Sequence, residues 1–203
     1  MTRMITKITN NLFIGEFSDI VDDESLALMD KWIHEKHYCG QQPELPVMQR
    51  LKELGITTIM NVMERSDERE EKLLRFIWYN GVRVRYKFEP VPSDGYIDEN
   101  MGIDKLKEGL AFAYYELDSI FFADYQEKVL VHCTGGIDRS PFVVASYLYK
   151  KIKYLWEDEK GITYGLNGQN TSYQFNSLHD AYDFIKKKRP FVLEHPEWIW
   201  WIE

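Results

Sequence analysis

Hydrophobic residues follow two spacings along this chain, and the two spacings divide it into short strands and longer helices. Apolar and β-branched residues with a period near two are typical of strands, whereas a period near 3.6 indicates amphipathic helices. We therefore predict strands over residues 5–8, 12–15, 57–62, 82–88 and 129–132. Helices are predicted over residues 22–38, 47–54, 67–79, 103–122, 141–151 and 178–188.

The alternation of strands with helices favours an α/β fold, because a helix carries the chain back over the sheet between parallel strands. We predict a three-layer sandwich in which helices flank a central, mainly parallel sheet of about five strands. A chain of 203 residues suits one domain with a complete hydrophobic core.

The turn between the last predicted strand and the following helix carries the most informative chemistry. A free cysteine keeps its proton up to about pH 8.5, and the unpaired N–H groups and dipole of a helix N-terminus favour the thiolate instead. Glycines let several backbone N–H groups point toward one centre, where they form an anion-binding nest. The turn reads His132-Cys133-Thr134-Gly135-Gly136-Ile137-Asp138-Arg139-Ser140.

Each part of this turn supplies something that attack on a phosphate ester requires. Arg139 presents a planar guanidinium that can bind two phosphate oxygens together, which a lysine cannot do. The Ser140 hydroxyl can donate to the sulfur of Cys133 and ease its departure, and the ring of His132 can orient the loop by hydrogen bonds. The alternative is a cysteine buried for packing beside a surface arginine, but the glycines and the Ser-Pro pair argue against it.

These residues resemble the HCxxGxxRS signature of the cysteine-dependent protein tyrosine phosphatase superfamily, and the Ser-Pro ending resembles its dual-specificity branch. Residues 8–15, 51–62 and 177–190 resemble, in order, the opening strand pair, the helix-to-strand unit and the closing helix of that branch. Within the last of these, Arg189 is expected to have a structural role only. The resemblance implies one phosphatase domain over residues 1–203 with probable insertions at 22–46 and 154–174, where the match is poor.

The family also uses a carboxylic acid, which protonates the leaving oxygen and later takes a proton from water. The resemblance implies that this acid lies in residues 89–99, a segment with proline and glycine between a strand and a long helix. Asp94 follows the Val-Pro run after one residue and is the preferred candidate, with Asp98 as its rival. Asp138 is a third candidate, because an acid just before the arginine of the turn resembles the arrangement in myotubularin-like lipid phosphatases. Any of them could instead cap a helix or occupy a solvated turn, and for Asp138 we favour a solvent-facing side chain that tunes the charge of the site.

The resemblance implies a reaction in two steps, with a phosphocysteine formed on Cys133 between them. Arg139 and the N–H groups of residues 134–138 would hold the equatorial oxygens. Asp94 would act first as acid and then as base, and Ser140 would stabilise the departing thiolate. No metal ion and no other cofactor is expected.

The substrate is suggested by the interior of the loop, which has an acid and no lysine. Family branches that act on phosphoinositides often carry lysines there, so we expect a phosphorylated protein as partner, with phosphotyrosine first and phosphoserine or phosphothreonine open. Alternatives are a phosphatase for a non-protein ester, such as an RNA 5′-phosphate or a phosphoinositide, and a phosphotyrosine-binding module without turnover. A rhodanese-like sulfur transferase also presents a loop cysteine but does not need the Arg-Ser-Pro ending.

Composition limits the binding partners and the cellular location that we expect. A net charge of −8 opposes general binding to nucleic acids or anionic membranes, which basic patches support. No stretch approaches the ~20 apolar residues of a membrane span, and the first residues lack the apolar centre of a signal peptide. With Cys39 and Cys133 as its two cysteines, a chain that uses one as a reactive thiol is expected in a reducing, cytoplasmic setting.

Three other groups of residues admit a functional and a structural interpretation. The first group is His34, His37 and Cys39; it lacks the second ligand pair of a zinc site, so we favour an exposed helix end without metal. The second is Arg83, Arg85 and Lys87, which could guide an acidic phosphopeptide, but a solvated strand face with salt bridges is favoured. The third is Trp198, Trp200 and Trp201, which could dock on a membrane or partner, but packing of the last segment onto the domain is favoured.

Overall fold

The structure is a computed structural model that describes residues 5–35, 43–92, 102–124, 126–156, 175–195 and 198. Its strands form one five-stranded sheet with the order β1-β2-β5-β3-β4, in which only β1 is antiparallel to its neighbour. The strands are β1 (Thr6–Lys7), β2 (Leu12–Glu16), β3 (Thr58–Asn61), β4 (Arg85–Phe88) and β5 (Val129–Cys133). The helices are α1 (Asp23–His34), α2 (Pro46–Leu54), α3 (Glu68–Tyr79), α4 (Gly102–Ala123), α5 (Arg139–Trp156) and α6 (Leu178–Lys186), with a 3-10 turn η1 (Phe17–Asp19).

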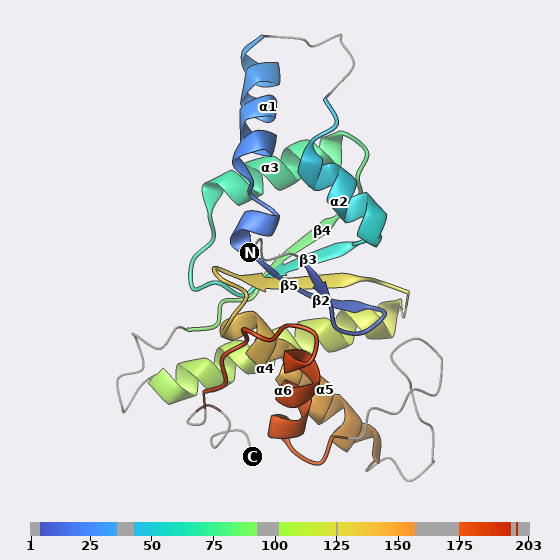
Figure 1. Cartoon of the computed structure of the whole chain (residues 1–203), viewed down its shortest axis with the longest axis vertical. Coiled ribbons are helices and arrows are strands. Elements are labelled where there is room, and N and C mark those ends of the chain that lie inside the picture. The colour runs from blue at the N-terminus through green and yellow to red at the C-terminus, as the bar shows by residue number, and fades with distance from the viewer. Residues whose placement is uncertain are drawn as a thin grey trace.

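The helices cover both faces of the sheet. Helices α1, α2 and α3 lie on one side, and α4, α5 and α6 lie on the other (Figure 1). The predicted three-layer α/β sandwich with a mainly parallel, five-stranded sheet is therefore confirmed.

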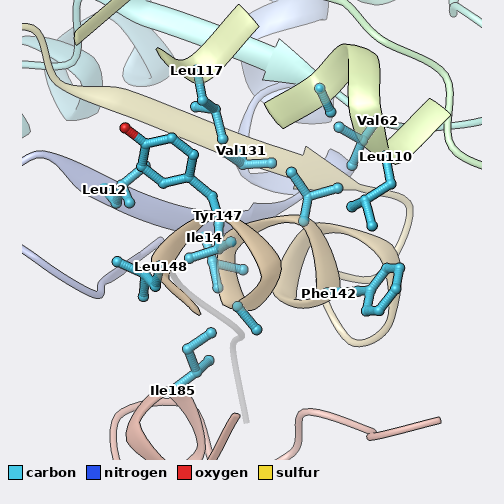
Figure 2. Packing of buried hydrophobic residues seen from close by; sticks show 14 of the residues in the cluster. Leu12, Ile14, Val62, Leu110, Leu117, Val131, Phe142, Tyr147, Leu148 and Ile185 are labelled. Atoms are coloured by element: carbon cyan, nitrogen blue, oxygen red, sulfur yellow. The ribbon is translucent and has the colours of Figure 1, made fainter. Parts of the chain in front are cut away.

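The alternation of side chains along each strand feeds two separate hydrophobic cores. On β5, Val129 and Val131 face the core under α4, α5 and α6, whereas Leu130 faces the core under α1, α2 and α3. On β2, Ile14 packs in the first core and Phe13 in the second. Figure 2 shows the first core, where side chains from the sheet meet those of α4, α5 and α6. Each fully buried aliphatic side chain contributes about 1.5–3 kcal/mol, so the two cores hold the sheet rigidly between the helices.

The predicted strand over residues 82–88 was wrong at its start. Only the last part of that segment pairs with β3, beginning where Arg85 lies opposite Thr58. The residues before it form the turn at the C-terminal end of α3: Gly81 has a φ of 86°, and the N–H of Val82 donates to the Ile77 carbonyl. The alternating pattern there comes from packing at the end of a helix rather than from sheet pairing.

Several predicted helix boundaries also moved, and α5 runs on to Trp156 where the prediction ended at residue 151. The described α1 ends at His34, and the rest of the predicted helix over residues 22–38 lies mostly outside the described residues. Helix α5 begins at Arg139 rather than at residue 141, because the Phe142 N–H already donates to the Asp138 carbonyl. The arginine of the loop is therefore the first residue of the helix.

The topology places one turn at a position that α/β folds use for ligands. Strand β5 lies between β2 and β3, and all three run parallel. In open α/β sheets, ligands bind beyond the carboxyl ends of such strands. The turn after β5, residues 134–138, leaves the middle of the sheet at this edge. Within the part of the chain that the structure describes, no helix is long and apolar enough to cross a membrane.

Candidate active site

The predicted nucleophile and the serine that follows the arginine lie against each other. Cys133 is the last residue of β5 and is only 2% exposed. The Ser140 hydroxyl, in the first turn of α5, donates to the Cys133 sulfur over 3.4 Å. A hydroxyl donor in this position can stabilise negative charge on the sulfur, which is the role that the sequence suggested for Ser140. The structure therefore brings this predicted pair together.

Arg139 contacts the first residue of the same turn. Its Nη2 donates to the hydroxyl of Thr134 over 3.0 Å, and the carbonyl of Thr134 in turn accepts from the backbone N–H of Phe17 over 3.2 Å. The turn is thereby tied at its first residue both to its own arginine and to the residue that follows β2. The guanidinium remains partly exposed, so it can also meet a ligand on the loop.

The tight turn depends on a glycine at position 136. Gly136 has a φ of +60°, in the left-handed region that other residues adopt only with strain. A Cβ there would also lie 2.4 Å from Nη2 of Arg189 and 2.6 Å from the Gly15 carbonyl oxygen. Both the backbone conformation and the close approach of neighbours therefore require glycine.

Arg189 is more closely connected to the loop than the sequence indicated. It is fully buried, and its Nε donates to the Gly136 carbonyl over 2.8 Å while its Nη1 donates to the Thr6 hydroxyl over 2.8 Å. The expectation of a structural role only was incomplete, because the residue that it supports belongs to the loop itself. Its hydrogen bond to the Gly136 carbonyl helps to fix the path of the backbone.

A buried polar cluster lies directly behind the nucleophile. The ring of His132 is fully buried, and its Nε2 lies 2.7 Å from Oε1 of Glu70, which is also fully buried on α3. The amide of Asn61 donates to the other oxygen of Glu70 over 2.6 Å, and the Tyr86 hydroxyl donates to that same oxygen over 3.1 Å. Burial, and then the neighbouring Glu70 carboxylate, raise the pKa of Tyr86, so this hydroxyl stays protonated.

The sequence predicted that His132 would orient the loop, but not which residue would hold His132. Its contact on Nε2 comes from α3, 62 positions earlier in the numbering, through Glu70. A sequence signal was present, since Glu70 lies three and four positions before Leu73 and Leu74 on the apolar face of the helix. A charged residue on that face must find a partner in the core.

The three aspartates considered for the general acid fall into two groups. Asp94 and Asp98 lie outside the described residues. Asp138 lies in the turn, and its Oδ1 is 3.2 Å from Nε2 of His195, beyond the end of α6. The carboxylate of Asp138 therefore has a partner that the sequence did not suggest.

With this geometry in place, the family assignment follows from sequence comparison. The model of the dual specificity phosphatase catalytic domain matches residues 37–162, a stretch that contains the whole turn after β5. The chain belongs to this family. Dual specificity phosphatases are hydrolases of phosphate esters, which fits a cysteine and an arginine placed on one turn after a buried strand.

Individual proteins similar to the chain agree with this family. A putative tyrosine phosphatase, 123R, of Invertebrate iridescent virus 6 is 33% identical over 72 residues, which is 36% of this chain and 35% of the viral protein. The match therefore spans only that part of the viral protein's length.

Solved structures show the same fold at low sequence identity. The Cydia pomonella PTP-2 phosphatase superposes with a TM-score of 0.59 at 12% identity, covering 99% of this chain and 89% of that chain. A variant of human DUSP28 superposes with a TM-score of 0.56 at 16% identity, covering 99% of this chain and 92% of that chain. At these identities the likeness supports the dual specificity phosphatase fold.

The other candidate groups of residues have mostly structural surroundings. Arg85 pairs with Glu127 at 2.6 Å and Lys87 with Glu116 at 2.5 Å, as expected for a solvated strand face with salt bridges. Trp198 is 1% exposed and packs on the domain, as predicted. Residues 37, 39, 200 and 201 lie outside the described residues, and the described ones contain no group of three or more metal-ligating side chains.

One buried carboxyl beside the loop gives a prediction for the pH dependence of stability. Burial raises the pKa of Asp19 from 3.8 to about 6, and its Oδ2 accepts from the Glu16 N–H over 2.9 Å. The folded state then binds more protons than the unfolded state between about pH 4 and pH 6, so the free energy of unfolding falls as pH rises through that window.

Asp19→Asn keeps the hydrogen-bond acceptor of this side chain without its charge. We expect it to raise the free energy of unfolding by about 1–2 kcal/mol at pH 7.5 and by a smaller amount near pH 4.5, measured by urea denaturation. Lower stability than the original chain at both pH values would contradict this.

Proposed function

We propose that this dual specificity phosphatase hydrolyses phosphotyrosine in proteins through a phosphocysteine intermediate on Cys133. Whether phosphoserine and phosphothreonine are also substrates is the open part of the proposal. The observation that carries it is the contact of 3.4 Å between the Ser140 hydroxyl and the sulfur of Cys133, on a turn that also carries Arg139. A cysteine buried for packing alone has no need of a hydroxyl donor and an adjacent arginine.

In the first step, the Cys133 thiolate attacks phosphorus in line and the bond from phosphorus to the ester oxygen breaks. The guanidinium of Arg139 and the backbone N–H groups of residues 134–138 hold the equatorial oxygens, where negative charge accumulates. Asp94 gives its proton to the leaving oxygen, which departs as an alcohol or phenol.

In the second step, water attacks the phosphocysteine and gives up its proton to Asp94. The bond from sulfur to phosphorus breaks, inorganic phosphate leaves, and the sulfur departs as a thiolate. The Ser140 hydroxyl, which donates to this sulfur in the structure, stabilises the departing charge. The protons balance, because Asp94 loses its proton in the first step and regains one from water in the second.

The substrate class rests on the charge of the turn. Residues 134–138 contain one acid and no lysine, and lysines there would suit a ligand with several phosphates. An aryl phosphate carries one phosphoryl group and needs only Arg139 and the N–H groups of the turn. The second candidate is a phosphoinositide or an RNA 5′-phosphate, and the net charge of −8 opposes the binding of such polyanions.

The proposal is tested by phosphate release from p-nitrophenyl phosphate and from phosphotyrosine, phosphoserine and phosphothreonine peptides, with EDTA present. We expect turnover that survives EDTA, with phosphotyrosine the best peptide. A phosphoinositide and a 5′-phosphorylated RNA are assayed in parallel. Faster turnover of either would replace the protein substrate by the second candidate, and capture of phosphotyrosine peptides without any turnover would indicate a binding module.

Asp94→Ala is expected to lower kcat for phenyl phosphate by about 10²-fold or more and to flatten the limb of the pH profile that falls toward high pH. The reason is that this limb reports loss of the proton from the general acid. Asp98→Ala serves as the matched control, because it removes the same side chain from the same segment. If Asp98→Ala or Asp138→Ala produces the loss instead, the acid has been assigned to the wrong residue.

A further inference from the structure

The chain after α6 runs along the turn and contacts three consecutive residues of it. Each contact comes from a different residue of this C-terminal segment, which is defined here as residues 189–195. The contacts are Arg189 Nε to the Gly136 carbonyl at 2.8 Å, the Leu193 N–H to the Ile137 carbonyl at 3.1 Å, and His195 Nε2 to Asp138 Oδ1 at 3.2 Å. The first two involve the backbone of the turn, and the third alone engages a side chain of the turn.

His195 is held in place independently of its contact with Asp138. Its ring stacks on that of Trp198, with centroids 4.3 Å apart and an interplanar angle of 28°. Trp198 is itself buried against Phe142 of α5, with ring centroids 4.9 Å apart, and its backbone N–H donates to the His195 carbonyl over 2.9 Å. Phe142 belongs to the core seen in Figure 2. The imidazole is thus fixed to the rigid part of the domain.

Asp138 is the one acidic residue of the turn, and its charge opposes the binding of a phosphate. Two like charges on neighbouring groups repel, and the repulsion grows where protein replaces water. The Asp138 side chain is 40% exposed, whereas that of His195 is 16% exposed. A ring N–H that donates to the carboxylate spreads its negative charge and fixes its direction.

Other titratable groups around the pair do not take over this role. Burial raises the pKa of Tyr182 on α6 well above its usual value, so its hydroxyl is neutral beside Asp138. Glu194 is engaged by Lys186 and by Nδ1 of His179. The described surroundings of Asp138 therefore offer His195 as its nitrogen partner.

We propose that His195 is a positioning residue that offsets the charge of Asp138 and so allows the turn to bind a phosphate dianion tightly. This inference rests on the proposed function and deepens it, since it names a determinant of phosphate affinity outside the signature. His195 touches neither the substrate nor the sulfur. It acts on the Michaelis complex and the product complex through Asp138.

The test measures phosphate affinity in two backgrounds. In the original chain, His195→Ala is expected to raise KM for p-nitrophenyl phosphate and the inhibition constant of inorganic phosphate, each about fivefold, with kcat changed less than about twofold. In the Asp138→Asn background, where no charge needs to be offset, the same replacement is expected to change either quantity less than about twofold. His34→Ala, which removes an exposed histidine at the end of α1, is the control and is expected to leave both constants unchanged.

Two results would overturn the inference. An equal loss of affinity in both backgrounds would mean that His195 acts through its packing on Trp198, and an unchanged affinity in the original chain would mean that Asp138 does not oppose phosphate. The same cycle is repeated by calorimetric titration of inorganic phosphate into proteins that carry Cys133→Ser, which requires no turnover. If His195→Ala and Asp138→Asn are coupled in this titration but no phosphate ester is turned over, the inference stands and the proposed function is rejected. If esters are turned over but the two replacements are not coupled, the proposed function stands and the inference is rejected.

Discussion

Replacement of Cys133 by serine is expected to lower turnover of p-nitrophenyl phosphate by more than about 10⁴-fold. A cysteine thiol is in general far more acidic than a serine hydroxyl, and a serine in the same place keeps its proton unless a base removes it. The hydroxyl that contacts the sulfur belongs to Ser140, which donates to the sulfur and so cannot serve as that base. The variant is therefore expected to retain the proposed phosphate-binding turn and to lack the proposed nucleophile.

Binding separates this explanation from a general loss of structure. Cys133→Ser should still bind inorganic phosphate, and its melting temperature should stay within a few degrees of the original, because the change of one atom leaves the buried contacts of β5 in place. Cys39→Ser, which removes the chain's other cysteine, is the control and should keep full activity. If Cys133→Ser kept a tenth of the activity, or Cys39→Ser lost it, the nucleophile would have to be sought elsewhere.

The sheet and the turn could be predicted from sequence because their signals are local. The run from Val129 to Val131 is apolar enough to be a buried strand, and glycines with a Ser-Pro pair mark the tight entry into the next helix. Residues that follow each other in the chain must lie together in space, so Cys133, Arg139 and Ser140 were bound to share one site. Dependence on local signals also explains the wrong prediction at residues 82–84, where apolar and basic residues alternate because of packing and not because they form a strand.

The partners of the turn could not be predicted, because they come from distant parts of the chain. Arg189 lies 53 positions from Gly136, and His195 lies 57 positions from Asp138. Nothing in their immediate neighbourhoods distinguishes a residue that supports a loop from an ordinary surface residue. Only the packing of α6 against α5 brings the chain that follows α6 back to the turn.

Glu70 is the clearest case of a residue hidden by its context. It lies in the run Glu68 to Lys72, where every residue is charged, and such a run usually indicates a solvated face. The structure buries this one carboxylate completely, 2.7 Å from the ring of His132. The position of Glu70 on the face that carries Leu73, and not its residue type, decides its role.

Glu70→Ala is accordingly expected to lower the free energy of unfolding by about 3–5 kcal/mol, since removal of one partner leaves the other buried without compensation. His132 would lose its contact on Nε2, and the amide of Asn61 and the hydroxyl of Tyr86 would lose their common acceptor. Urea denaturation followed by tryptophan fluorescence gives the change in free energy. Activity should fall as well, because His132 directly precedes the predicted nucleophile.

The neighbouring position offers a control that differs mainly in burial. Glu71→Ala removes the same side chain from the next position of α3, where the carboxylate is 40% exposed and lies 3.8 Å from Arg75. We expect it to change the free energy of unfolding by less than about 0.5 kcal/mol, the usual effect of losing a solvated ion pair. Equal effects at the two positions would mean that both replacements act through helix propensity. The difference between the two variants therefore measures what the cluster behind the cysteine contributes to the fold.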